Sequence, residues 1–138
     1  MDRTASNELT YFAPDGSREI YELLSHGFSA RIKKIINFQG VSWTFQYMTS
    51  PTGVTQLFRV THSSGRFLTF AWQGNTPWSR WFSVASIADS DGHVHAYNWT
   101  HGGGVGDTLE VVLPPRPATI DGALVTDKLE YNMPLSGS

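Results

Sequence analysis

Residues Leu57–Val84 read LFRVTHSSGRFLTFAWQGNTPWSRWFSV, and this segment decides the fold of the chain. Runs of β-branched and aromatic residues alternate here with Ser63-Ser64-Gly65 and with a longer stretch around residues 73–80. Strands favour the former residue types, and turns favour Ser, Gly, Asn and Pro. The segment therefore predicts three short strands joined by two turns.

The strand pattern continues on both sides of this segment. From Val41 to Tyr47 the apolar residues alternate with polar ones, which is the period of a half-buried strand. Further strands are expected at residues 32–38, 55–61, 67–72, 81–87, 93–99, 109–113 and 123–131. About eight strands at spacings of roughly ten residues predict a mainly β fold, an antiparallel β-sandwich or a flattened barrel.

One short N-terminal helix is expected from Ser17 to about Gly27. Ser17 can cap it, and Ile20, Leu23 and Leu24 recur at helical spacing. The amphipathic character of this segment also allows it to act as a membrane-inserting element.

The length and composition of the chain predict one domain over residues 1–138, with 1–16 as a flexible N-terminal segment and 132–138 as a tail. We detect no internal repeat. The net charge of −2 argues against a nucleic-acid partner, because phosphate binding needs a basic face. The absence of cysteine excludes disulfides and thiolate metal sites. Neither an apolar signal region nor a spanning stretch is visible, so we expect a cytoplasmic protein or one released without a signal peptide.

The turn after Phe70 is unusually rich in tryptophan. Its candidate ligand-binding residues are Trp72, Gln73, Asn75, Trp78 and Arg80. An indole ring can stack on a sugar or lie at a lipid interface, and the amides and the guanidinium can bind hydroxyls or a phosphate. For Trp72 and Trp81 a core position is favoured over a ligand-binding one.

A second candidate surface lies on the strand at 93–99. Side chains alternate between faces along a strand, so His93, His95, Tyr97 and Trp99 share one face. This face suits a ligand groove, and the opposite face of small residues suits the core. A His-x-His pair can also bind a metal if a third ligand is near, and the candidates are Asp91 and His101. We assign no metal, no cofactor and no catalytic residue.

The segment resembles the signature region of the fungal fruit-body lectins and the actinoporin-like cytolysins. The matching residues are Leu57-Phe58-Arg59, Gly65, Phe67-Leu68 and the run Trp78–Val84. The aegerolysins are a further similar group. The resemblance implies a compact β-sandwich that binds a cell surface.

Taken together, these features predict a binding protein that recognises a glycan or lipid headgroup, with weak sites multiplied in a homo-oligomer. Two alternatives stay open. One is a membrane-lytic protein in which Ser17–Ser29 detaches and inserts. The second is a small barrel enzyme or carrier, of isomerase or cyclase type, with the histidine-bearing face lining its pocket.

Overall fold

The computed structural model describes residues 2–5, 7–25, 27, 29–51, 53–73, 83–101, 107–118 and 122–133. Within these ranges the chain forms strands and turns and no helix. It divides into two compact units, unit 1 from Met1 to Leu68 and unit 2 from Thr69 to Ser138.

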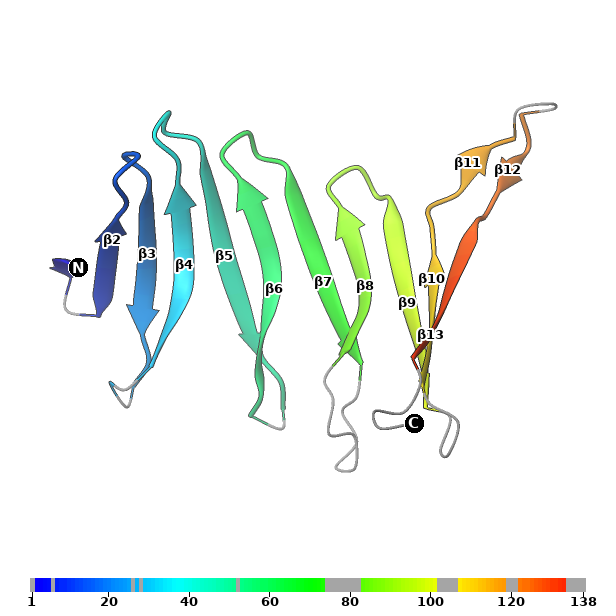
Figure 1. Cartoon of the computed structure of the whole chain (residues 1–138), viewed down its shortest axis with the longest axis horizontal. Coiled ribbons are helices and arrows are strands. Elements are labelled where there is room, and N and C mark those ends of the chain that lie inside the picture. Colours follow the sequence, from blue (N-terminus) through cyan, green and yellow to red (C-terminus); the bar gives the residue numbers. More distant parts are fainter. Residues whose placement is uncertain are drawn as a thin grey trace. The chain divides into compact units, whose positions relative to one another are not determined.

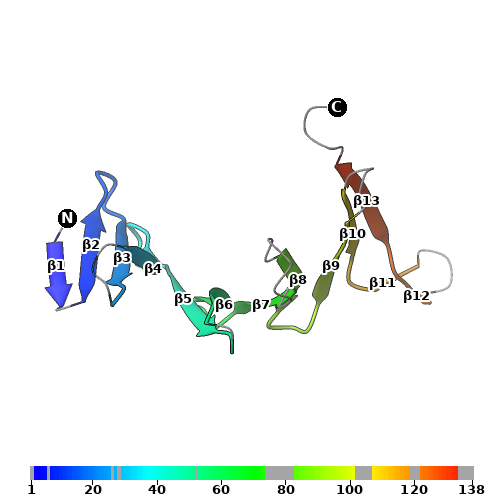
Figure 2. The same ribbon diagram turned by 90° about the horizontal axis from the view of Figure 1, so that it is seen from below.

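Unit 1 is an antiparallel meander in which each strand pairs with the next one along the chain (Figure 1). Its strands are β1 (Asp2–Ala5), β2 (Glu8–Phe12), β3 (Arg18–Leu23), β4 (Ala30–Ile36), β5 (Ser42–Thr49) and β6 (Thr55–His62). Figure 2 shows them following one another in a single row. The meander thus needs only local connections.

Unit 2 contains a less regular antiparallel sheet. Its strands are β7 (Phe67–Gln73, beginning just before the unit boundary), β8 (Ser83–Asp89), β9 (Val94–His101), β10 (Asp107–Val112), β11 (Arg116–Pro117), β12 (Leu124–Val125) and β13 (Lys128–Met133). β8, β9 and β10 pair in order, and β13 then pairs with β10. β11 and β12 form a separate two-stranded excursion between β10 and β13.

The mainly β, antiparallel prediction is confirmed, but the helix predicted from Ser17 to Gly27 is wrong. Residues 18–23 are strand β3, because both of its edges find partners: Tyr21 lies opposite Leu9 of β2 and opposite Ile32 of β4. The helical spacing of a few apolar residues cannot outweigh two ladders of backbone hydrogen bonds. The N-terminal segment expected to be flexible holds β1 and β2, and β13 extends into the expected tail.

One five-residue turn recurs at five places among the described residues. In each copy the first N–H donates to the fifth carbonyl, and the N–H of the fourth residue, a glycine, donates to the first carbonyl. The copies span residues 13–17, 37–41, 50–54, 62–66 and 89–93. Their glycines all have φ between 84° and 90°. This conformation is strained for residues with a Cβ atom, so glycine is required.

In every copy except the one that begins with Ala13, the side chain of the first residue also accepts a hydrogen bond. Asn37 Oδ1 accepts the N–H groups of Gln39 and Val41, each at 3.0 Å. Asp89 Oδ1 does the same for Asp91 at 3.0 Å and His93 at 2.9 Å. Between β2 and β9 every second connection along the chain is this turn, at a spacing of about 25 residues. The repeated unit is therefore one pair of strands. It is hard to detect in the sequence because only the turn residues recur.

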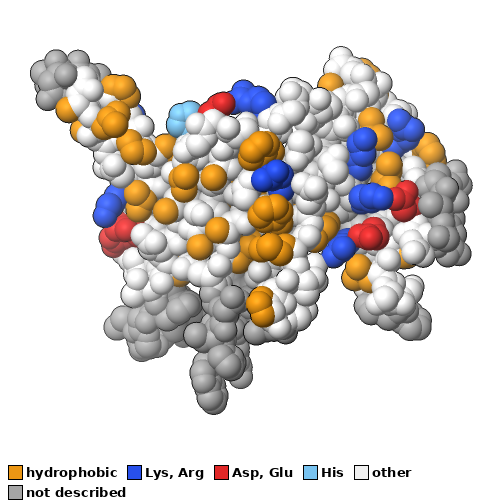
Figure 3. Space-filling view, turned by 180° about the vertical axis from the view of Figure 1, so that it is seen from behind, with side chains coloured by type: hydrophobic (Ala, Val, Ile, Leu, Met, Phe, Trp, Pro, Cys, Tyr) orange, Lys and Arg blue, Asp and Glu red, His pale blue; other side chains and the backbone are white. Residues whose placement is uncertain are grey.

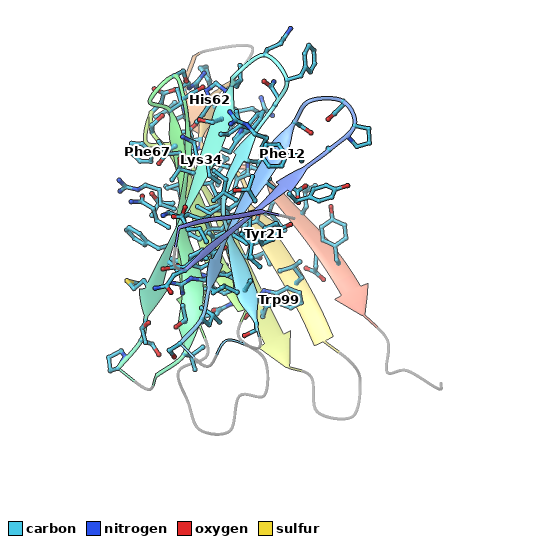
Figure 4. All side chains as sticks on the ribbon, turned by 90° about the vertical axis from the view of Figure 1, so that its left-hand side faces the viewer. Phe12, Tyr21, Lys34, His62, Phe67 and Trp99 are labelled. Atoms are coloured by element: carbon cyan, nitrogen blue, oxygen red, sulfur yellow. The ribbon has the colours of Figure 1, made fainter. Side chains whose placement is uncertain are left out.

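Few side chains are fully buried. Of those described, Thr10 (3% exposed) and Val111 (8%) fall in the buried class. Large apolar side chains such as Phe12 and Met48 remain about half exposed. Side chains project to both sides of the ribbon (Figure 4), and oppositely charged side chains adjoin one another on the face seen in Figure 3. Each unit therefore stabilises itself mainly through cross-strand neighbours.

Cross-strand contacts in unit 1 are of two kinds. Trp43 packs edge-on against His62, with ring centroids 5.5 Å apart. Polar contacts join the strands that come earlier in the chain: Arg31 Nε of β4 lies 3.0 Å from Glu22 Oε2 of β3, and Lys33 of β4 forms an ion pair with Glu8 of β2.

Candidate functional site

The Trp-rich turn is described only where it leaves strand β7. Trp72 and Gln73 are the last residues of β7, and both are half-buried. Asn75, Trp78 and Arg80 lie outside the described residues.

Gln73 links this turn to the second candidate surface. Its Nε2 donates a hydrogen bond to the carbonyl oxygen of Tyr97, at 3.1 Å. The contact joins the end of β7 to β9, the second strand along from it in the sheet order β7-β8-β9. The structure therefore brings together Gln73 and Tyr97, one residue from each predicted cluster.

The face of β9 that carries His95, Tyr97 and Trp99 faces apolar neighbours. His95 lies opposite Ile87 of β8, and Tyr97 and Trp99 lie opposite Val111 and Leu109 of β10. Residues directly opposite in an antiparallel pair share a face of the sheet. On this face Tyr97 and Trp99 are half-buried and His95 is exposed, and the expectation that the small residues of β9 face a core stays a prediction.

The other face of β9 and β10 is polar, and the sequence analysis missed it. Asn98 Nδ2 donates to Glu110 Oε1 at 3.1 Å, and Lys128 of β13 lies 3.7 Å from the other carboxylate oxygen of Glu110. The signal was present in the alternation of residues 107–112, where Glu110 falls between two apolar neighbours.

His93 does not belong to the strand face on which it was predicted. It is the last residue of the turn at 89–93, where its exposed ring places Nδ1 3.0 Å from Asp89 Oδ2. Hydrogen bonds from the His93 N–H and then from its ring lower the pKa of Asp89. His95 is exposed on the neighbouring strand, and Trp99 lies toward the other end of β9 (Figure 4).

A possible cation-binding group occurs at the same turn. One ligand atom from each of Asp89, Asp91 and His93 lies within 4.8 Å of the others. His95, the partner expected in a His-x-His site, is not a member of the group. The turn itself explains the geometry, since Asp89 occupies the acceptor position that Asn37 fills elsewhere. The arrangement therefore gives no reason to assign a metal.

No helix in the described ranges is long and apolar enough to cross a membrane. Comparison of the chain with protein-family models, curated proteins and solved structures finds no match. The resemblance to fruit-body lectins and actinoporin-like cytolysins stays a prediction.

Proposed function

We propose that the chain is a structural scaffold built of β-hairpin repeats and that it acts without catalysis. The observation that carries this proposal is the recurrence of one hydrogen-bonded turn at five places, each with a glycine at the same position. A protein that repeats a supersecondary unit extends a surface by adding units, and each unit contacts only its neighbours. Unit 1 follows this rule, because each of its strands pairs with the next in sequence.

A hairpin repeat cannot cover its own apolar face, and this supports a second part of the proposal. Phe12 and Met48 are each 52% exposed, and the larger aromatic residues of β5 are only half-buried. Burial of apolar surface contributes about 25 cal/mol per Å². We therefore propose that the scaffold sheet is covered by a second layer, as in a β-sandwich.

Deletion of one repeat tests the scaffold. Removing residues 13–36 joins Phe12 to Asn37, so that one copy of the turn replaces another and the direction of every later strand is kept. We expect the shortened protein to keep a β-type circular dichroism spectrum and a cooperative unfolding transition. Removing residues 25–36 alone deletes one strand and is the control, since the remaining strands must then reverse. Unfolding of both variants would contradict a repeat scaffold.

A second candidate function is recognition of a glycan or lipid headgroup by the Trp-rich turn. The hydrogen bond from Gln73 to Tyr97 favours it, because it ties the base of the turn to strand β9, which carries a half-buried Tyr and Trp. Trp78 would stack on the target, and Asn75 and Arg80 would supply hydrogen bonds.

Tryptophan fluorescence tests this second function. The wild type and Trp78→Ala are titrated with sphingomyelin vesicles, phosphatidylcholine vesicles and a panel of soluble glycans. A blue shift with vesicles that is lost in Trp78→Ala supports a lipid headgroup, and a response to one glycan supports a lectin. Trp43→Phe is the matched control, because Trp43 packs against His62 within unit 1. A response that survives Trp78→Ala contradicts the proposed site.

Two observations bear on membrane lysis and pocket catalysis, which stay predictions. The lytic mechanism needed a helix at residues 17–29, and Arg18–Leu23 is a strand. The barrel enzyme or carrier needed His93 and His95 inside a cavity, and both side chains are exposed.

A further inference from the structure

Strand β13 ends the sheet of unit 2 with one open edge. In the part of the chain that the structure describes, β13 pairs with β10 along Lys128–Met133 and has no strand on its other side. The strand alternates polar residues with Leu129 and Tyr131, which are 45% and 51% exposed. An exposed strand edge of this kind is a template for another strand.

The hydrogen-bond pattern shows which backbone groups face the open edge. Leu113 N–H donates to the carbonyl of Asp127 at 3.0 Å, in register with the β10–β13 ladder. Hydrogen-bonded and non-hydrogen-bonded pairs alternate along an antiparallel ladder, so every second residue of β13 points its N–H and C=O toward β10. The residues whose backbone groups point to the open edge are therefore Lys128, Glu130 and Asn132.

The charges along this edge are incompletely paired. Glu130 lies directly opposite Glu110 of β10, a like-charge pair that is unfavourable across a sheet. Lys128 contacts Glu110 at 3.7 Å, and among the described residues Glu130 has no cation of its own. The open edge thus presents an unneutralised carboxylate and, two residues away, an exposed lysine.

We infer that β13 pairs with β13 of a second copy of the chain, antiparallel and with the two-fold axis at Leu129. In this register Lys128 of each copy lies opposite Glu130 of the other, and both are edge-facing residues that exchange backbone hydrogen bonds. Leu129 lies opposite Leu129 of the partner copy, in a non-hydrogen-bonded pair, where side chains come closest. A register centred on Glu130 would instead place the two Glu130 carboxylates opposite each other.

Charge reversal tests both the partner and the register. Wild type, Lys128→Glu, Glu130→Lys, the double swap, and an equimolar mixture of the two single variants are measured by sedimentation velocity across a concentration series. We expect dimers for the wild type, the double swap and the mixture, and at least tenfold weaker association for each single variant alone. The mixture restores complementary charges only between chains, so misfolding of one variant cannot imitate this result.

Three outcomes would overturn the inference. A wild type that is monomeric at every concentration has no such interface. A dimer that survives both single reversals uses another surface. Growth into larger species indicates pairing of β13 with a different edge, since a two-fold contact closes after two copies.

Discussion

Units 1 and 2 contain the same kind of hairpin turn but differ in how many of their strands it connects. In unit 1 every described connection between strands β2 to β6 is short, and four of the five recurrent turns occur there. In unit 2 the strands are joined by one such turn, by a longer segment at 74–82, by residues 102–106, and by the β11–β12 excursion. The candidate ligand-binding residues belong to unit 2.

The difference implies that the hairpin turns form the sheet, whereas the other connections carry the candidate binding residues. Regular local hairpins are sufficient to build a sheet, and they leave little sequence free for a binding site. Longer connections carry binding residues more readily because they tolerate variation without disturbing the strands. The comparison leads to four expectations that can be measured.

The largest effect is expected from Trp43→Ala in unit 1. The substitution removes the edge-on contact with His62 and half-buried apolar surface, and should lower the free energy of unfolding by about 2 kcal/mol. Amide hydrogen exchange read separately for each unit is the measurement. We expect faster exchange in β4–β6 and unchanged exchange in β9–β10. Equal acceleration in both units would show that they unfold together and would remove the distinction between them.

The recurrent turn should respond alike in the two units. Gly40→Val and Gly92→Val each place a β-branched residue at φ of 86° or 87° and should each cost about 1.5 kcal/mol of stability. Thermal unfolding checks both variants. Gln39→Ala is the control, because it alters the exposed residue next to Gly40 but keeps the turn conformation. Unequal effects of the two glycine variants would mean that the turns are not equivalent.

Acid should weaken the turn at 89–93 in unit 2 and not the turn at 37–41 in unit 1. Hydrogen bonds from His93 lower the folded-state pKa of Asp89 below 3.8, so its stabilisation is complete above the unfolded-state pKa and is lost as the pH falls through the folded-state pKa. Asn37, the residue at the same position in the turn at 37–41 of unit 1, does not ionise. Asp89→Asn should flatten the dependence of the melting temperature on pH below about 4. An unchanged pH profile would assign the acid sensitivity to other carboxylates.

The smallest effect is expected at the ion pair of Glu22 and Arg31. Both side chains are partly exposed, so Glu22→Gln should cost no more than about 0.5 kcal/mol, and less at high salt. Chemical denaturation at two salt concentrations is sufficient to test this. A loss much larger than that of Gly40→Val would show that ion pairs, rather than turns, hold unit 1 together.

Local patterns predicted the strands and turns that depend on neighbouring residues. The alternation around Trp43 predicted β5, and Ser63-Ser64-Gly65 predicted the turn between β6 and β7; both are confirmed. These features are determined by side-chain period and by the need for glycine at positive φ.

Features that depend on distant partners were beyond the same reasoning. Arg18–Leu23 fits a helical period as well as a strand, and only its pairing with β2 and β4 decides between them. The contact of Gln73 with Tyr97 also joins residues on separate strands, and no local sequence pattern predicts it. The pairing of Tyr97 with Val111 and of Trp99 with Leu109 likewise depends on β10, which the pattern of β9 alone does not contain.

The pairing of β10 with β13 has a consequence for the speed of folding. Each hairpin of unit 1 closes a short loop, so its contacts can form as soon as the second strand exists. β11 and β12 lie between Val112 and Lys128 in the sequence, so the pairing of β13 with β10 closes a longer loop. Because contacts of greater sequence separation form more slowly, the last strand should be the rate-limiting addition to the sheet of unit 2. During synthesis the hairpins of unit 1 can be complete while this final strand is still being made.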